Sequence, residues 1–178
     1  MTHFPQGFCI LCCFFQGIIV SLPFYHGRKT SIRGTDPPVI PIVDWISVLE
    51  SSDFEYEFDI PETEYLMRID VNAYSRILNN LLQNVLIHSK GNKVTFHISE
   101  NDQQARIILA DNGRGISSGH LPHIFERMYQ CDQSRSAKGN GLGLSIVKEL
   151  VAAHKGTIVA DSTPDKETIF TILLPKSL

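Results

Sequence analysis

Apolar and polar residues recur along this chain at two spacings, and these spacings predict its elements. Short alternating or apolar runs bounded by turn residues predict strands at 53–60, 65–69, 93–100, 105–112, 157–163 and 167–175. Apolar residues at helical spacing predict helices at 42–50, 71–89 and 142–156. Strands surround the helices without strict alternation. We therefore expect an α+β fold, a two-layer α/β sandwich in which a mixed sheet packs on helices.

The predicted helix at 71–89 is amphipathic. Six of its apolar residues fall on or near one face: Ile77, Leu78, Leu81, Leu82, Val85 and Leu86. The predicted helix at 142–156 ends at Gly156, which we expect at its C-terminal cap.

The N-terminal part of the chain differs from the rest. Residues 8–25 are almost entirely apolar and are followed by basic residues, so this segment is either a membrane-spanning helix or a spurious start outside the fold. Residues 30–41 form a Pro/Gly linker. The expected organisation is an apolar segment at 1–29, the linker, and one domain at 42–178.

Composition narrows the class of protein. The chain has 178 residues, 43% hydrophobic and 20% charged, which is typical of a globular domain. Its net charge of −3 provides no basic stripe, so we expect no nucleic-acid partner. Cys9, Cys12 and Cys13 cluster in the apolar run without a second Cys or His pair at ligand spacing. They therefore predict neither a disulfide framework nor a metal site.

Two asparagines stand on an otherwise apolar helix face. Asn80 and Asn84 are four residues apart and project from the same side of the predicted helix. An amide carbonyl oxygen is a suitable ligand for a nucleotide-bound Mg²⁺. Alternatively, these amides bond to neighbouring backbone groups, as buried polar side chains usually do.

A carboxylate ends the apolar strand at 105–112. Asp111 is followed by Gly113 and Gly115, and an unpaired carboxylate at a buried strand end is costly, so something should bond to it. A carboxylate can accept a hydrogen bond from an exocyclic amine, and glycines let the backbone approach a flat ring. The alternative is an ordinary Asp-Asn-Gly turn.

A second glycine-rich stretch precedes the last helix. Gly139, Gly141 and Gly143 alternate along the chain, and free backbone N–H groups at a helix N-terminus form a site for anions such as phosphates. The pattern is not the Walker pattern, because no Gly-Lys-Ser/Thr closes it.

In this order, the motifs resemble those of the ATP-binding catalytic domain of two-component sensor histidine kinases, members of the gyrase, heat-shock chaperone and mismatch-repair ATPase superfamily. The stretch "RILNNLLQNVLIHS" is similar to the N box of that family, "DNGRGI" and "GNGLGLSIVKELVAAHKG" to its two glycine boxes, and "IFERMYQCD" to its F box. The resemblance covers about residues 53–175 and implies a Bergerat-type fold that binds ATP and Mg²⁺.

The resemblance also implies roles for single residues. Asp111 would bind the adenine amine, Asn84 would coordinate Mg²⁺, and Asn80 would lie near the metal and the γ-phosphate. Phe125 would pack a lid at 117–138. The remaining residues implied to face the nucleotide are Gly113, Gly115, Ile116, Gly139, Gly141, Leu142, Gly143 and Leu144.

The sequence departs from the family pattern in places. Ile87 stands where a Lys is common, which predicts weaker nucleotide binding, and His88 and Met128 replace aromatic residues. None of the seven histidines lies in a sequence like the family's phospho-acceptor box.

We therefore expect the γ-phosphoryl group to go to a His on a dimerisation domain in another chain, which would pass the signal to a response regulator. The alternative is a degenerate or truncated regulatory module without autonomous kinase activity. The F box disfavours an anti-sigma type of Ser kinase. Asn80 stands where a gyrase-type ATPase would have a Glu base, which disfavours that class as well. The catalytic domain is expected on the cytoplasmic side, with residues 8–25 as a membrane anchor if they span the bilayer.

Overall fold

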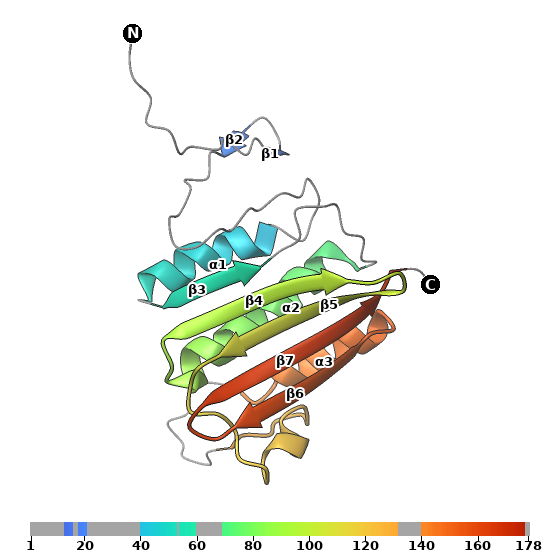
Figure 1. Ribbon diagram of the computed structural model, residues 1–178. Helices are drawn as coiled ribbons and strands as arrows, with labels where there is room; N and C mark the ends of the chain where they lie inside the picture. Colours follow the sequence, from blue (N-terminus) through green and yellow to red (C-terminus); the bar gives the residue numbers. More distant parts are fainter. Residues whose placement is uncertain are drawn as a thin grey trace.

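The computed structural model describes residues 13–15, 18–20, 40–52, 54–59, 69–131 and 140–176. Its main body is a five-stranded sheet packed on helices (Figure 1). Helices α2 (Val71–Asn84) and α3 (Gly143–Ala153) lie behind the sheet in that view, and α1 (Ile40–Ser51) lies beside the edge strand β3 (Glu55–Asp59). The predicted two-layer α+β sandwich is confirmed.

The sheet is mixed, as predicted. Its order is β3-β4-β5-β7-β6, with β4 at Lys93–Glu100, β5 at Gln104–Asp111, β6 at Thr157–Thr163 and β7 at Glu167–Pro175. Strands β3 and β4 pair in parallel and the other neighbours are antiparallel. A parallel pair needs a crossover connection, and α2 lies in the chain between β3 and β4. The β5–β7 register places Asp111 opposite Thr168.

One face of the sheet forms the core with the helices. Buried and less buried residues alternate along β4, β5 and β7, so every second side chain faces the helices. The sheet residues of the core are Phe58, Val94, Phe96, Ile98, Ile107, Leu109, Phe170, Ile172 and Leu174. Helix α2 contributes Ile77, Leu78, Leu81 and Leu82, which confirms its predicted apolar face.

Helix α1 begins two residues before the expected helix at 42–50, so that Pro41, assigned to the linker, is its second residue. Proline is tolerated in the first turn, where no intrahelical N–H donor is needed. The buried Trp45 fixes this helix. Its indole Nε1 donates to Asn79 Oδ1 of α2 at 3.1 Å, and its ring packs edge-on against Phe96.

The helix predicted at 71–89 changes type near its end. Asp70 caps α2 by accepting a hydrogen bond from Ala73 N, and the regular helix ends at Asn84. Residues Val85–Ser89 form a π-helical turn, η2, and Lys90 follows in the left-handed region at φ 57°. The helix predicted over 71–89 is therefore confirmed in extent, and its last five residues are π-helical and not α-helical.

The end of α3 also differs from the prediction. Lys155, not Gly156, adopts the left-handed cap conformation, at φ 57°. Gly156 is needed for space, because a Cβ there would lie 2.5 Å from the Leu173 carbonyl oxygen. His154 joins the two helices: its Nε2 accepts a hydrogen bond from Asp70 N, and its Nδ1 lies 2.7 Å from Leu150 O. This contact fixes α3 relative to α2.

The predicted strand at 65–69 falls largely outside the described residues, as does most of the apolar segment 8–25. Within that segment, β1 (Cys13–Phe15) and β2 (Ile18–Val20) form a small antiparallel pair. Among the helices of the described residues, none is long and apolar enough to cross a membrane.

Candidate functional site

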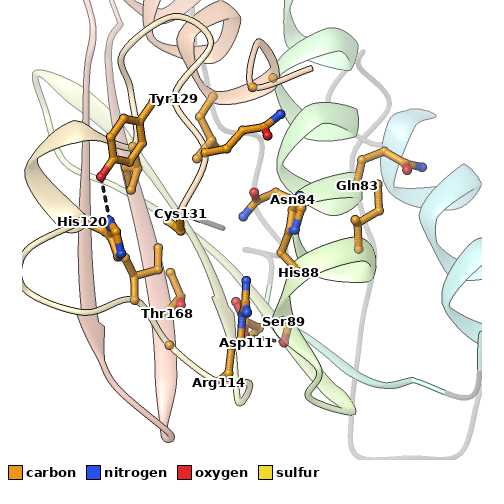
Figure 2. Close-up of a pocket in the computed structure, with 18 of the residues that line it drawn as sticks. Gln83, Asn84, His88, Ser89, Asp111, Arg114, His120, Tyr129, Cys131 and Thr168 are labelled. Atoms are coloured by element: carbon orange, nitrogen blue, oxygen red, sulfur yellow. Dashed lines mark hydrogen bonds between the residues drawn. The ribbon is translucent and has the colours of Figure 1, made fainter. Parts of the chain in front are cut away.

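A pocket of about 560 Å³ lies between α2, the loop after β5 and the segment that leads into α3 (Figure 2). Pockets of this size accommodate drug-sized ligands and cofactors. The lining brings together segments far apart in the sequence, from Asn80 on α2 through Asp111 on β5 to Leu144 on α3.

The carboxylate of Asp111 is buried at the end of β5. The chain itself supplies two hydrogen-bond donors to it: Ser89 Oγ at 2.6 Å and Gly113 N at 2.9 Å. Both end on Oδ1, so part of the bonding that the sequence assigned to a ligand is internal. Burial raises the pKa of Asp111, and the hydrogen bonds from Ser89 and Gly113 act in the opposite direction.

The two glycines after Asp111 fit against the chain itself. Gly115 has a φ of +65°, and a Cβ there would lie 2.2 Å from the Thr163 carbonyl oxygen. At Gly113 a Cβ would lie 2.0 Å from Ser89 Oγ. Only glycine is compatible with either approach. The close backbone contacts expected from these residues are therefore made to the protein, with Gly115 also lining the pocket.

Asn80 and Asn84 both line the pocket, as the helical spacing predicted. Asn80 Nδ2 donates to Arg76 O at 2.7 Å, so the backbone-bonding alternative holds for this nitrogen. Asn80 Oδ1 faces Gly143 of α3, where a Cβ would lie 3.2 Å away. Within the described residues, the side-chain amide of Asn84 makes no hydrogen bond to the protein. Its oxygen is therefore available to a ligand.

The N-terminus of α3 opens onto the same pocket. Gly141 has a φ of +65°, and its carbonyl accepts a hydrogen bond from Met128 N. Leu142 occupies the N-cap position and carries no polar side-chain atom that could bond to the first N–H groups. Gly141, Gly143 and Leu144 line the pocket. This arrangement is suited to an anion.

The segment between β5 and α3 forms another wall. His120 and Tyr129 share a hydrogen bond of 2.7 Å and stand across the pocket from Asn84 in Figure 2. Desolvation, with smaller contributions from Cys131 and Glu126, raises the pKa of Tyr129, so its phenol stays protonated at neutral pH.

Side-chain contacts also attach this segment to the body of the domain. Phe125 packs edge-on against Phe170, with the Lys148 ammonium over its ring. The Arg127 guanidinium is paired with Glu149 of α3.

The pocket includes most of the residues proposed from the sequence. It is lined by Asn80, Asn84, Asp111, Gly115, Ile116, Gly141, Gly143 and Leu144. Three of the proposed residues lie outside the lining: Gly113 packs on Ser89, Phe125 packs against the core, and Leu142 is the N-cap residue of α3. Gly139 lies outside the described residues. Sequence reasoning missed several lining residues: Gln83, Ser89, Arg114, His120, Tyr129, Gln130, Cys131, Asn140 and Thr168. For Thr168, the only sequence signal was its place on a strand that pairs with β5.

Comparison with known proteins gives consistent results. Residues 69–178 match the family described as "Histidine kinase-, DNA gyrase B-, and HSP90-like ATPase". The chain is 34% identical over 139 residues to the sensor histidine kinase WalK of Bacillus subtilis. The matched region covers 75% of this chain and 23% of WalK. It is 40% identical over 112 residues to the sensor protein IrlS of Burkholderia pseudomallei, covering 61% of this chain and 24% of IrlS. The chain thus spans about a quarter of the length of these relatives.

Solved structures show the same fold. The mycobacterial sensor histidine kinase MprB superposes with a TM-score of 0.66 at 28% identity, covering 77% of this chain and 94% of that chain. The catalytic domain of the histidine kinase ThkA gives a TM-score of 0.67 at 22% identity, covering 79% of this chain and 92% of that chain.

Proposed function

The chain belongs to the family of histidine kinase-, DNA gyrase B- and HSP90-like ATPases as an ATP-binding catalytic domain of the sensor histidine kinase type, and we propose that it binds Mg-ATP and transfers the γ-phosphoryl group to a histidine on a separate dimerisation domain. The observation that carries this proposal is that one pocket combines a buried carboxylate, an amide oxygen and an uncapped helix N-terminus. These groups match the base, the metal and the phosphates of a nucleotide.

Asp111 binds the adenine in this proposal. Its Oδ1 is occupied by Ser89 and Gly113, and the carboxylate lines the pocket, so Oδ2 is the oxygen that remains to accept a hydrogen bond from the exocyclic amine. Ile116, Ile124 and Leu144 supply apolar lining near the polar groups. Gly115 contributes backbone to the same wall.

Asn84 is the proposed protein ligand of Mg²⁺. Its amide oxygen is a hard donor, which suits a cation that keeps water and phosphate oxygens as its other ligands. Such an ion, when bound, would neutralise charge on the phosphates. Asn80, with Oδ1 facing Gly143, lies on the same helix face toward the phosphate end.

The phosphates face the N-terminus of α3. The Leu142 side chain caps none of the backbone N–H groups that follow it. The helix dipole favours negative charge at this end. Gly141 and Gly143 keep side chains out of this approach. The chain therefore orients the γ-phosphoryl group, and positioning together with charge neutralisation supplies the catalysis.

The phospho-acceptor and the response regulator belong to the proposed partners. Because none of the seven histidines lies in a sequence like the family's phospho-acceptor box, the acceptor histidine is assigned to a separate dimerisation domain. Attachment to a membrane through residues 8–25 stays a prediction.

A second candidate function is nucleotide binding without transfer. Ile87 lines the pocket and is 42% exposed, so an apolar side chain stands on a wall where the family resemblance implies a lysine. The loss of a cation near the phosphates favours weaker binding and slower transfer.

One transfer assay separates the two candidates. The full chain is mixed with Mg²⁺, ATP labelled on the γ-phosphoryl group, and a histidine-bearing dimerisation domain of a sensor histidine kinase. We expect acid-labile, alkali-stable phosphate on that domain, and none with Asp111→Asn or when the acceptor histidine is replaced. ATP binding without transfer to domains from several such kinases would favour the binding module.

A further inference from the structure

Ser89 connects η2, the turn that follows Asn84, with Asp111 at the end of β5. It is the last residue of η2 and is buried. Its Oγ donates to Asp111 Oδ1 at 2.6 Å and accepts a hydrogen bond from Gly91 N at 3.0 Å. Its carbonyl oxygen accepts a hydrogen bond from Arg114 N at 2.6 Å. Ser89 is therefore bonded to the Asp111 carboxylate, to the backbone of Gly91 and to the backbone of Arg114.

The π-helical turn explains how Ser89 reaches this position. A π-turn is wider than an α-turn and shifts the side chains that follow it around the helix axis. The left-handed Lys90 then reverses the chain so that Gly91 N points back to Ser89 Oγ. Gly113 packs directly on the serine, because a Cβ there would lie 2.0 Å from Oγ and 2.2 Å from the carbonyl oxygen. The contact between Ser89 and residue 113 therefore requires a glycine at position 113.

We propose that Ser89 is a positioning residue that occupies Oδ1 of Asp111, turns Oδ2 toward the ligand, and thereby determines the preference of the pocket for a purine with a 6-amino group. This inference rests on the proposed nucleotide function. A carboxylate with both oxygens free can rotate and accept hydrogen bonds in several directions. Because Ser89 and Gly113 hold Oδ1, the carboxylate keeps one orientation and Oδ2 points in one direction. In that direction Oδ2 favours a base with a hydrogen-bond donor over a base with an acceptor or an apolar edge.

The charge of the carboxylate supports the same role. Burial raises the pKa of Asp111, and donation from Ser89 opposes this rise. Loss of the hydroxyl would move the pKa of Asp111 further up and favour the protonated acid, which is a poorer acceptor. Ser89 therefore acts on both the direction and the charge of the group that meets the base.

The test compares two nucleotides on the full chain. ATP and purine riboside triphosphate differ at the 6-amino group, which the latter lacks. Dissociation constants are measured by calorimetry with Mg²⁺ for the wild type, Ser89→Ala and Ser89→Thr. We expect wild type to prefer ATP by about tenfold or more, the size of one hydrogen bond to a charged group. Ser89→Ala should lose this preference, and Ser89→Thr, which keeps the hydroxyl, should retain it.

Ser162→Ala is the matched control. Ser162 Oγ also bonds to the loop after β5, accepting from Ile116 N, and donates to Glu167 O, but it does not contact Asp111. If loop anchoring were the whole role of Ser89, both alanine variants would weaken the two nucleotides equally. An unchanged preference in a folded Ser89→Ala chain would overturn the proposal. Absence of ATP binding by the wild type would instead contradict the proposed function.

The pH dependence of ATP affinity gives a second readout. Because a higher pKa means protonation at higher pH, the acid-side loss of ATP affinity should begin at higher pH in Ser89→Ala than in the wild type. The other titratable or charged groups on the pocket wall are common to both chains: His88, Arg114, His120, Tyr129 and Cys131. Identical profiles for the two proteins would contradict the role of Ser89. If Ser89→Ala does not fold, the same comparison is made with Ser89→Cys, whose thiol is a weak donor.

Discussion

The two ends of the pocket are built in different ways. At the end formed by Asp111, the carboxylate, the η2 turn and the following loop are bonded to one another through Ser89 and Gly113. At the other end, the N-terminus of α3 follows Leu142, which has no polar side-chain atom, and the Asn84 amide has no recorded internal hydrogen bond within the described residues.

This difference indicates what each end contributes. The hydrogen bonds at the Asp111 end exist without a ligand, so in the proposed nucleotide site this end would provide selectivity at little cost in ordering. In the proposed site, the ligand would complete the bonding of the donors and the acceptor at the α3 end. We therefore expect changes at the first end to affect both folding and base recognition, and changes at the second to affect binding more than folding.

The largest effect is expected from Gly113→Ala. The new Cβ would overlap Ser89, so the loop must move and the Ser89–Asp111 bond must break. We expect the free energy of unfolding to fall by about 3 kcal/mol and ATP binding to be lost. Denaturant unfolding and calorimetry measure both. Gly119→Ala is the control, because a Cβ there meets nothing within 4 Å, and it should change stability by less than about 0.5 kcal/mol.

At the opposite end, Asn84→Ala should reduce Mg²⁺-dependent ATP affinity by about tenfold, or about 1.4 kcal/mol, and leave Mg²⁺-free binding unchanged. Its unfolding free energy should stay within about 0.5 kcal/mol of the wild type. Asn72→Ala, an exposed position on the same helix, controls for helix propensity. Equal losses with and without Mg²⁺ would remove Asn84 from the metal site.

The apo protein should become more stable in Asp111→Asn. The folded pKa of this carboxyl lies above its unfolded value, so burying the charge costs stability at neutral pH, and the cost disappears as pH falls through the folded pKa. We expect a gain on the order of 1 kcal/mol at pH 7 that shrinks on acidification. Thermal unfolding at several pH values measures it, with the exposed Asp102→Asn as control. A variant less stable than wild type at every pH would show that the Ser89 and Gly113 bonds outweigh burial.

The smallest effect concerns the segment next to the α3 end. Arg127 and Glu149 are paired at 2.6 Å, with side chains 72% and 55% exposed. A double-mutant cycle with alanine at both positions should give a coupling below about 0.5 kcal/mol in stability, because solvent screens exposed pairs. A coupling above about 1 kcal/mol would mean that this end is more firmly built than its contacts indicate.

The spacing of apolar residues predicted those helices and strands that bury one face. The strands β4, β5, β6 and β7 and the amphipathic part of α2 follow directly from apolar spacing. The π-turn was missed because Val-Leu-Ile-His-Ser continues a helical pattern, and the hydrogen bond from Ser89 to Asp111 is a tertiary contact. At the end of α3 the left-handed position falls on Lys155, and Gly156 is required for its small size against Leu173.

The candidate site was predictable only in its motif residues. Asn84 and Asp111 are conspicuous as polar groups in apolar surroundings, and the pocket contains both. Ser89 and Thr168 have ordinary sequence surroundings, and their importance comes from tertiary contacts across 22 residues and across the β5–β7 pair. The sequence did not single out His120, which lines the pocket beside Tyr129.

The most direct measurement is a calorimetric titration of the full chain with ATP, with and without Mg²⁺, beside Asp111→Asn. A nucleotide site with Asp111 at the base and Asn84 at the metal predicts saturable binding that Mg²⁺ strengthens and that the variant loses while remaining folded. A folded wild type that does not bind ATP, or a variant that binds it as tightly, would contradict the assignment of this pocket.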